Sequence, residues 1–475
     1  METQTELQTR LTNRELEEHY ENTPSDFVDY LRFTTPKDIR ESQKKAFLAG
    51  EEYSPEYTYP ELDDLEFDKK VQYEKHAITK AMLELDVLRR QGTTSESEIG
   101  LFEDFYTKRL QTIMLAEAAR DLKDARTSGN WEVAEQSFTD LNIEAYGEFD
   151  TPKYQAMMST EYSRASGFEP GSDQAQRIRS ELMAYLENVK SDQEIEKPLI
   201  DDESLKRIQS VLLERFSSTL SQIPETDDSI YYDARECADI INRIFESEGK
   251  GWVCEIREDI SVPGTIPAEK VLAIPADFRR NARGLRKFMI HEARDHIDRQ
   301  ENGESTGKLV LKKGTANYGD VEEGLGVLME CALDGSIDNN PAINRARDRY
   351  ITAGLALGTD SEAPRDARQV HDVLWRILAL RNSSDGNITD EDIEKAREEA
   401  YVHVENAFRG TEFWMRGMIY SKLKIYYEGL EKNAQFFMDN IDDIDGALDI
   451  AMIGKYDHTD PEERKKVKDM LGLAA

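Results

Sequence analysis

The residues best suited to chemistry are two histidines, His291 and His296, with Glu292 directly after the first, in a chain of 475 residues that has only 7 histidines. Neutral imidazoles are the commonest zinc ligands. A neighbouring carboxylate can take a proton from metal-bound water, whose pKa the ion lowers to about 7. The cluster therefore predicts a zinc hydrolase site.

The spacing of the two histidines places a demand on the helix that carries them. In the H-E-x-x-H arrangement the ligands are four residues apart and, at about 100° per residue, share one helix face. His291 and His296 are five residues apart, which is roughly 140° out of register on a regular helix. We therefore expect a local bulge, such as the π-bulges found at functional sites, or a loosened helix end.

Two histidines do not complete a catalytic zinc site, which usually has three protein ligands and one open position. The best source of a third ligand is Glu322-Glu323-Gly324-Leu325, on an expected helix capped by Asp320. On the residues alone, an equally good interpretation is that these carboxylates complement the dipole in the first turn of that helix.

Apolar residues recur three and four positions apart over much of the chain, which predicts amphipathic helices packed on one another. After residues 249–251 the pattern changes, and residues 252–256 and 270–274 predict two short strands separated by a Pro-Gly turn. Asn281 is expected to cap the histidine helix. The fold class is therefore mostly α with a small β component (α+β). The expected helices cover residues 65–90, 172–190, 205–220, 231–245 and much of 341–471.

A polar stretch at residues 191–203, with Pro198 near its centre, predicts a boundary between two regions. The first, residues 1–195, is expected to be a helical N-terminal region that includes an extended Tyr/Pro segment at residues 53–60. The second, residues 200–475, is expected to be the catalytic domain.

The charge balance limits the partners. The chain has 61 Lys and Arg against 96 Asp and Glu, so its net charge is -35. Because this negative charge repels phosphate groups, we expect neither a nucleic acid nor a membrane as partner. Residues 279–313 differ, because they hold ten Arg or Lys against five Asp or Glu. Positive charge is thus concentrated around the histidine pair.

The sequence also predicts a cytoplasmic protein. No run approaches the ~20 apolar residues of a membrane span, and residues 1–21 lack the order of a signal peptide. The three scattered cysteines form neither a CxxC site nor a disulfide framework and are expected to be buried or inert. His19, His76 and His458 lie in polar stretches that are expected to be exposed.

Several of these motifs together resemble the DUF1704 family, which includes the microtubule-associated tyrosine carboxypeptidases and bacterial proteins labelled flavohaemoglobin expression-modulating QEGLA motif proteins. The similarity runs from about residue 45 onward. Its strongest part comprises His291-Glu-x-x-x-His296, Asn302-Gly303, Gly314, Tyr318, Glu322-Glu323-Gly324-Leu325 and Glu330. Its weaker parts comprise Phe47 with residues 54–59, Phe408-Arg409-Gly410, residues 421–429, and Gly454-Lys455 with Gly472.

The resemblance implies a gluzincin-like zinc metallopeptidase domain on which the N-terminal region packs. It also implies that Zn²⁺ is bound by His291, His296 and Glu323, with Glu292 as the general base. Ala293-Arg294-Asp295 departs from the family, which commonly has Ile-Gly-Thr there. Leu423 replaces a usual Asp, and Asn406 stands where an Arg often precedes the Arg-Gly element.

The leading hypothesis is a zinc metallocarboxypeptidase that removes C-terminal residues from peptide or protein tails. Tyr426 or Tyr420 is a candidate to stabilise the oxyanion. Arg409 and Lys422 are candidates to hold the terminal carboxylate of the substrate, although each is also consistent with an ordinary surface cation. Acidic tails are the expected substrate class, because Lys308, Lys312 and Lys313 would attract an anionic chain end.

The alternative hypothesis is a helical binding or regulatory protein with a structural or vestigial metal site, which would need a fourth protein ligand. For His371 and His403 a packing or surface role is favoured over that of a ligand. Asp295 is equally suited to binding the ion and to orienting His296. A metallohydrolase acting on an amide other than a peptide is a third hypothesis.

Overall fold

The computed structural model is mostly helical, with a few short strands, as the sequence predicts. Within the described part of the chain, no helix combines the length and apolarity needed to cross a membrane. The Tyr/Pro segment at residues 53–60 lies outside the described residues, as do residues 1–19. The structure describes residues 20, 37–51, 67–187, 199–258, 260, 263–337, 340–359 and 363–473.

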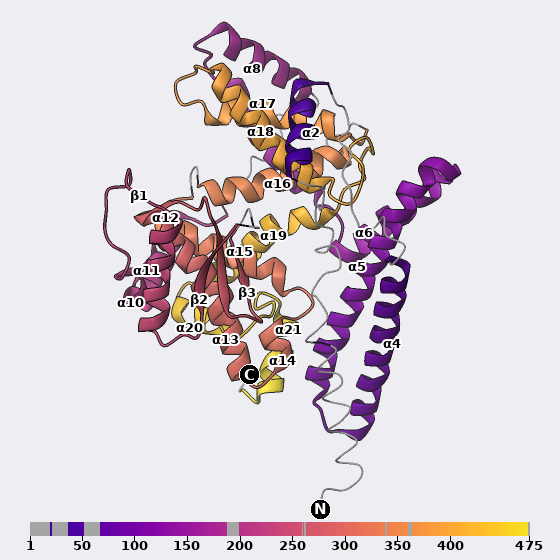
Figure 1. Ribbon diagram of the computed structural model, residues 1–475, viewed down its shortest axis with the longest axis vertical. Coiled ribbons are helices and arrows are strands. Elements are labelled where there is room, and N and C mark those ends of the chain that lie inside the picture. Colours follow the sequence, from indigo (N-terminus) through magenta and orange to yellow (C-terminus); the bar gives the residue numbers. More distant parts are fainter. Residues whose placement is uncertain are drawn as a thin grey trace, which may run out of the picture. The chain divides into compact units, whose positions relative to one another are not determined.

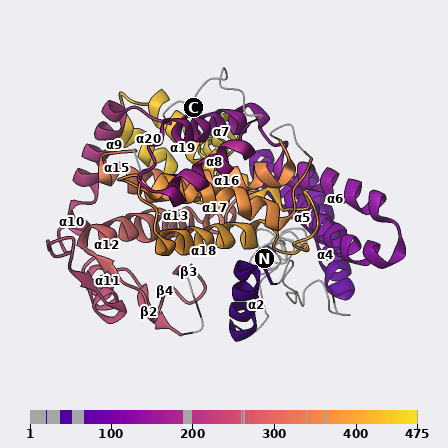
Figure 2. The ribbon, with the colours of Figure 1, turned by 90° about the horizontal axis from the view of Figure 1, so that it is seen from above.

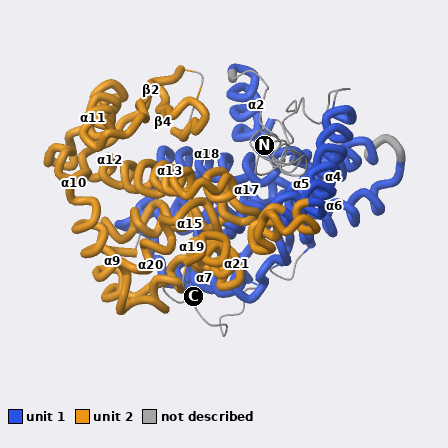
Figure 3. The backbone as a smooth tube through the Cα atoms, turned by 90° about the horizontal axis from the view of Figure 1, so that it is seen from below, with its two compact units in different colours: residues 1–87, 103–197, 345–427 blue, residues 88–102, 198–344, 428–475 orange. Residues whose placement is uncertain are grey.

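The chain forms two compact units, each assembled from segments that are distant in the sequence (Figure 3). The first unit comprises residues 1–87, 103–197 and 345–427. The second unit comprises residues 88–102, 198–344 and 428–475. The histidine pair belongs to the second unit.

In the second unit a π-helix, η2 (Met289–Ile297), carries both histidines; Figure 1 labels the helices α12 and α13 on either side of it in the sequence. The α-helix α12 (Ala282–Phe288) leads into η2, and α13 (Asp298–Ser305) follows it directly. The others are α9 (Asp202–Arg215), α10 (Ser217–Leu220), α11 (Ala234–Ser247), α14 (Leu309–Lys313), α15 (Tyr318–Asp334), most of α19 (Ile425–Asp439), α20 (Ile444–Ala451) and α21 (Pro461–Leu471).

A three-stranded sheet lies beside α11 in the second unit (Figure 2). Its order is β2-β4-β3, in which β2 (Val253–Arg257) runs parallel to β4 (Val271–Pro275). These are the two strands that the sequence predicts. The third strand, β3 (Gly264–Ile266), pairs antiparallel with β4. It has only three residues, too few for an alternating pattern to reveal it in the sequence.

Three of the expected helices differ from the observed ones. The helix expected over residues 172–190 covers only Asp173–Tyr185. The expected helix at residues 231–245 starts late: Tyr231–Tyr232 form strand β1, paired with β5 (Arg280–Asn281), and Asp233 caps α11 in a capping box with Glu236. The expected helix at residues 205–220 is interrupted at Phe216 between α9 and α10. The predicted cap at Asn281 is confirmed, because its side chain accepts a hydrogen bond of 2.8 Å from the backbone N–H of Gly284.

Two hydrophobic cores of the second unit hold η2 from different sides. Ile290 belongs to a core built by α9, α15, α19 and α20. Met289, Ala293 and Ile297 belong to a core built by α11, α12 and the sheet. Since apolar residues of η2 are buried in both cores, the backbone between the two histidines is fixed by packing.

The first unit is helical. Its α17 and α18 lie side by side (Figures 1 and 2). The facing ends of α4 and α5, residues 88–102, belong to the second unit, as do the first residues of α16. The elements are α2 (Lys37–Ala49), α4 (Phe67–Gln91), α5 (Glu96–Ser128), α6 (Trp131–Tyr146), α7 (Thr151–Gly167), α8 (Asp173–Tyr185), α16 (Pro341–Leu357), α17 (Ala367–Asn382), α18 (Asp390–Ala407) and the short 3₁₀ turn η3 (Ser421–Lys424).

The three cysteines are buried free thiols, as the sequence predicts. Burial raises the pKa of Cys237 to about 11 and the pKa of Cys254 to about 12. These thiols are therefore protonated at neutral pH and act as small apolar residues of the core.

The prediction that His458 is exposed is wrong, because its side chain is completely buried against the ring of Phe436, at a centroid distance of 5.0 Å. Burial, together with the nearby charges of Arg299 and Arg464, lowers the pKa of His458 well below its usual range. The folded protein therefore holds this imidazole neutral, whereas the unfolded chain protonates it below about pH 6.5.

We expect this difference to destabilise the protein in acid. Above about pH 6.5 the imidazole of His458 is neutral in both the folded and the unfolded chain, and stability is at its full value. Below that pH the unfolded chain takes up a proton that the folded protein does not, so the free energy of unfolding falls by up to about 1.4 kcal/mol per pH unit. Urea unfolding at several pH values between 7.5 and 5.5 should show a smaller pH dependence for His458→Phe than for the wild type. Equal pH dependences would contradict this assignment.

Candidate metal site

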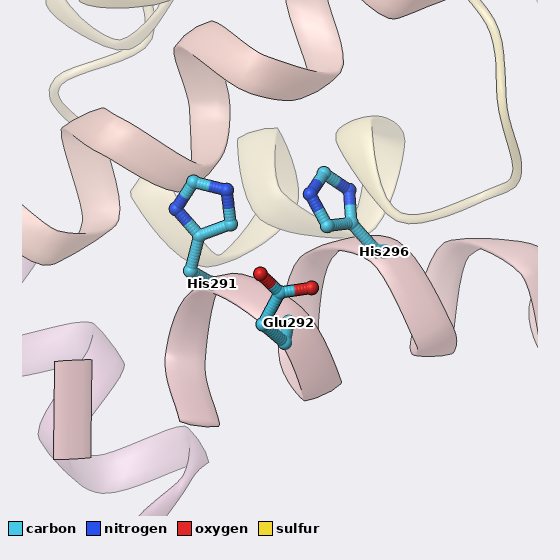
Figure 4. A group of neighbouring side chains, drawn as sticks. All are labelled: His291, Glu292 and His296. Carbon is cyan, nitrogen blue, oxygen red and sulfur yellow. The ribbon is translucent and has the colours of Figure 1, made fainter. Parts of the chain in front are cut away.

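The π-helix brings the two histidines together. In η2 the backbone bonds residue i to residue i+5, so side chains five apart return to one face, and the ring centroids of His291 and His296 lie 4.9 Å apart. The predicted bulge is therefore confirmed. Figure 4 shows both rings on the same side of the helix.

Glu292 completes a three-residue cluster with the histidines. One carboxylate oxygen and one nitrogen from each ring all lie within 4.8 Å of one another. In Figure 4 the carboxylate is directed toward the space between the two rings. The carboxylate can therefore reach an ion held by the imidazoles or a water molecule beside that ion.

Glu330 orients His291. Its Oε1 lies 2.6 Å from Nδ1 of His291, within hydrogen-bond distance. With a proton held on Nδ1, the lone pair lies on Nε2, which is the arrangement of a carboxylate–histidine–zinc triad. Oε2 of Glu323 lies 4.0 Å from that Nε2.

Glu322 lies beside the second histidine at ion-pair distance, without a hydrogen bond. Its Oε2 lies 3.3 Å from Nδ1 of His296, and this nitrogen forms no hydrogen bond among the described residues. Glu322 is itself buried and neutralised by Lys455, whose Nζ lies 3.3 Å away, and by Arg299 at 3.8 Å. Both histidines therefore have a carboxylate at Nδ1, which favours Nε2 as the metal-binding atom of each.

Glu322 and Glu323 are consecutive in sequence but differ in environment. The side chain of Glu323 is 41% exposed and that of Glu322 is 8% exposed. Helix α15 begins at Tyr318 after Asn317, so the predicted cap at Asp320 is wrong and the two glutamates lie beyond the first turn. Glu323 approaches His291, although it is not among the three residues within 4.8 Å of one another.

The two charged residues between the histidines have separate partners. Arg294 pairs with Glu248 and, at 3.0 Å, with Asp298. Asp295 is completely buried, 3.6 Å from Arg299, and burial raises its pKa to about 6. Asp295 also lies with His296 and Glu322 in a second cluster whose ligand atoms are within 4.8 Å. Asp295 is therefore close enough to His296 for either predicted role, that of a ligand or that of a residue that orients His296.

The surroundings of the histidines favour positive charge. Burial opposes protonation of His296, but the charge of Glu322 outweighs it and raises the pKa of the imidazole. Burial likewise opposes protonation of His291, and the hydrogen bond with Glu330 outweighs it. Carboxylates that attract a proton to these rings would also attract a cation. The donor set and its charge therefore fit a divalent metal ion.

Two glycines of α15 allow the close packing around the site. A Cβ on Gly324 would lie 2.2 Å from the backbone carbon of Gly429, so only glycine lets these segments approach so closely. A Cβ on Gly326 would lie 2.8 Å from Cε1 of His291. Gly326 thus makes room for the imidazole itself.

We expect Gly326→Ala to displace the His291 ring and to weaken zinc binding by about 10- to 100-fold, comparable to the loss of an outer-shell partner. The matched control is Gly319→Ala on the same helix, where a Cβ would meet nothing within 4 Å. Zinc dissociation constants of the two variants, measured against a competing chelator, test this. Equal affinities would contradict the assigned role of Gly326.

The basic segment at residues 279–313 is largely neutralised. At least seven of its ten cations form ion pairs, several of them with carboxylates outside the segment such as Asp334 and Glu225. Its excess positive charge is therefore offset locally, which weakens its attraction for an acidic substrate. The paired cations are Arg283, Arg286, Lys287, Arg294, Arg299, Lys308 and Lys312.

The four residues predicted to contact substrate belong to the first unit. Tyr420 is buried and packs edge-on against Phe138. The guanidinium of Arg349 lies over the Tyr426 ring, 3.9 Å from its centroid. Arg409 donates to Oδ1 of Asn406 at 3.0 Å, and Lys422 is half-buried in η3. Their roles remain predictions.

No protein-family model matches this chain, and no curated protein matches it. The resemblance to the DUF1704 family therefore rests on the motif residues in the sequence alone.

The structure adds three residues to the site that the sequence analysis leaves without a role: Glu330, Lys455 and Arg299. Glu330 had a signal, because it follows Glu323 by seven residues and thus falls on the same face of one helix. Lys455 comes from a loop after α20, far along the chain, and nothing in the local sequence indicates that it pairs with Glu322.

Proposed function

We propose that this protein is a zinc-dependent peptidase whose reaction takes place at His291, His296 and Glu292. The proposal rests mainly on one observation: the π-helix gathers the two imidazoles on one face, with a carboxylate at Nδ1 of each and Glu292 beside them. Three protein ligands with one open position suit catalysis, and Glu323 is the proposed third ligand.

In this proposal His291, His296 and Glu323 hold Zn²⁺, which would polarise the scissile carbonyl and acidify the attacking water. Glu292 takes a proton from that water and later delivers it to the leaving amine. Glu330 and Glu322 keep the two imidazoles in the tautomer that presents Nε2. Lys455 and Arg299 hold Glu322 ionised, because their charges, with that of His296, keep its pKa well below the usual range despite burial.

The proposed activity is that of a carboxypeptidase, acting on peptide or protein tails in the cytoplasm, as the DUF1704 resemblance and the composition imply. A gluzincin-like arrangement of the catalytic domain belongs to the same proposal. Arg409 and Lys422 are proposed for the terminal carboxylate, and Tyr426 or Tyr420 for the oxyanion. Acidic tails are proposed as substrates.

A peptide library with defined C-termini tests the proposed activity. After incubation with the zinc-loaded protein, mass spectrometry should show products shortened from the C-terminus, and chelation should stop their formation. Peptides that differ only in the charge of the tail test the substrate class. Faster cleavage of basic than of acidic tails would contradict the substrate class, and products cut only internally would contradict the carboxypeptidase assignment.

The competing proposal is a closed, structural metal site in a binding protein. It is favoured by the position of Glu292, whose carboxylate lies within 4.8 Å of both imidazole ligand atoms and could itself bind the ion. A fourth protein ligand would fill the open position. The two proposals differ in the effect of Glu292→Gln: the peptidase proposal predicts unchanged zinc binding, and the structural-site proposal predicts its loss.

A further inference from the structure

A second cluster of metal-binding side chains lies in the first unit, separate in sequence from the histidine pair. It comprises Asp348 on α16 with Glu399 and His403 on α18, and one ligand atom of each lies within 4.8 Å of the others. Glu399 and His403 are four residues apart and therefore share a face of their helix. We propose that these three residues bind a divalent transition-metal ion that ties α16 to α18.

The state of His403 supports a ligand role. Its side chain is only 6% exposed, and no hydrogen bond to either ring nitrogen is present among the described residues. Neither nitrogen is among the fully enclosed side-chain atoms that lack a partner, so both keep contact with solvent. An ion arriving from solvent can therefore reach this imidazole.

A second buried histidine of this unit has a protein partner. Nε2 of His371 on α17 lies 3.0 Å from the backbone oxygen of Arg397. His403 has no comparable partner among the described residues, and its nearest metal-binding neighbours are Asp348 and Glu399.

The carboxylates are arranged to accept an ion. Nη1 of Arg381 donates to Oδ1 of Asp348 at 2.6 Å, which fixes that carboxylate while its other oxygen accepts no hydrogen bond among the described residues. Such an outer-shell partner is typical of metal-binding carboxylates. Burial and the charge of Asp348 raise the pKa of Glu399. A cation between the two carboxylates would relieve that repulsion.

The ligand set limits the metal. One imidazole and two carboxylates suit Zn²⁺ or Mn²⁺, and the absence of a thiolate ligand disfavours Cu⁺. Glu399 is only partly buried, so an ion can reach the cluster from solvent. Because the ligands come from two helices, the bound ion would link α16 to α18 within the first unit. Three protein ligands would leave a coordination position open to solvent.

Metal stoichiometry tests the proposal independently of any enzymatic activity. Equilibrium dialysis against Zn²⁺, followed by elemental analysis, should show one equivalent less in His403→Leu than in the wild type. Glu399→Gln, an isosteric change at a partly exposed position, should show the same loss. A loss in this conservative variant shows that the lower stoichiometry of His403→Leu does not come from misfolding. His76→Ala, at an exposed histidine of the same unit, is the matched control and should bind as the wild type does. Equal stoichiometry in all four proteins would overturn the proposal.

The two sites can be separated by one further pair of variants. Zn²⁺ should raise the melting temperature of His291→Ala but not that of His291→Ala with His403→Leu. A rise that is equal in both would overturn the second site. If peptide hydrolysis is absent while the stoichiometry falls as expected, only the proposed function fails.

Discussion

Glu292→Gln should bind zinc as the wild type does and should lose peptide hydrolysis. The amide cannot accept the proton of the attacking water, and general acid–base catalysis contributes about 10²- to 10⁴-fold to a rate. We therefore expect kcat/KM to fall by at least about 100-fold. Elemental analysis and hydrolysis of the best library peptide, measured on the same preparation, provide both values.

The control for this variant is Glu304→Gln, which removes a carboxylate on α13 that is paired with Lys312 at the surface. It should leave both zinc content and kcat/KM unchanged. If Glu292→Gln instead loses its zinc, Glu292 is a ligand, the site is closed, and the binding-protein proposal gains. Unchanged hydrolysis in Glu292→Gln would remove Glu292 from the reaction altogether.

Substitutions at three glutamates of α15 should weaken zinc binding to different degrees. Glu323→Ala removes a proposed ligand, and we expect its zinc affinity to fall by more than about 100-fold, the upper end of the effect of outer-shell residues. Glu330→Gln and Glu322→Gln remove only the partners of the imidazole Nδ1 atoms. For these two we expect a loss of about 10- to 100-fold.

The order of these effects decides which glutamate binds the ion. Chelator competition gives the dissociation constants, and circular dichroism shows whether each variant is folded. Glu322→Gln also leaves Lys455 and Arg299 without their shared carboxylate, so it should lower stability as well as affinity. If Glu322→Ala abolishes binding while Glu323→Ala does not, the cluster of Asp295, His296 and Glu322 becomes the better ligand set.

Much of the site could be predicted from the sequence because the residues that define it lie close together in the chain. A regular helix would place His291 and His296 on different faces, so their five-residue spacing predicts a distortion of the helix, and the π-helix is that distortion. Asn281 was recognisable as a cap because capping depends on the side chain and the next few backbone N–H groups. The two longer strands were recognisable from their apolar residues, whereas β3 was too short.

The remaining features depend on contacts between distant segments. Lys455 reaches Glu322 only after the chain has folded. The burial of His458, which lies in a turn, follows from its contact with Phe436 on α19, although its neighbours in sequence are polar. The cluster around His403 needs Asp348 from α16, and helical periodicity relates only Glu399 to His403. Periodicity within one helix therefore cannot predict these pairings.

The most direct test of the central claim is a zinc titration of the metal-free His403→Leu variant, which retains the histidine pair as the one proposed metal site. The rate of peptide hydrolysis should rise in proportion to added zinc and level off at one equivalent. A site that fills with zinc while every peptide of the library stays intact would contradict the claim that His291, His296 and Glu292 form a peptidase site.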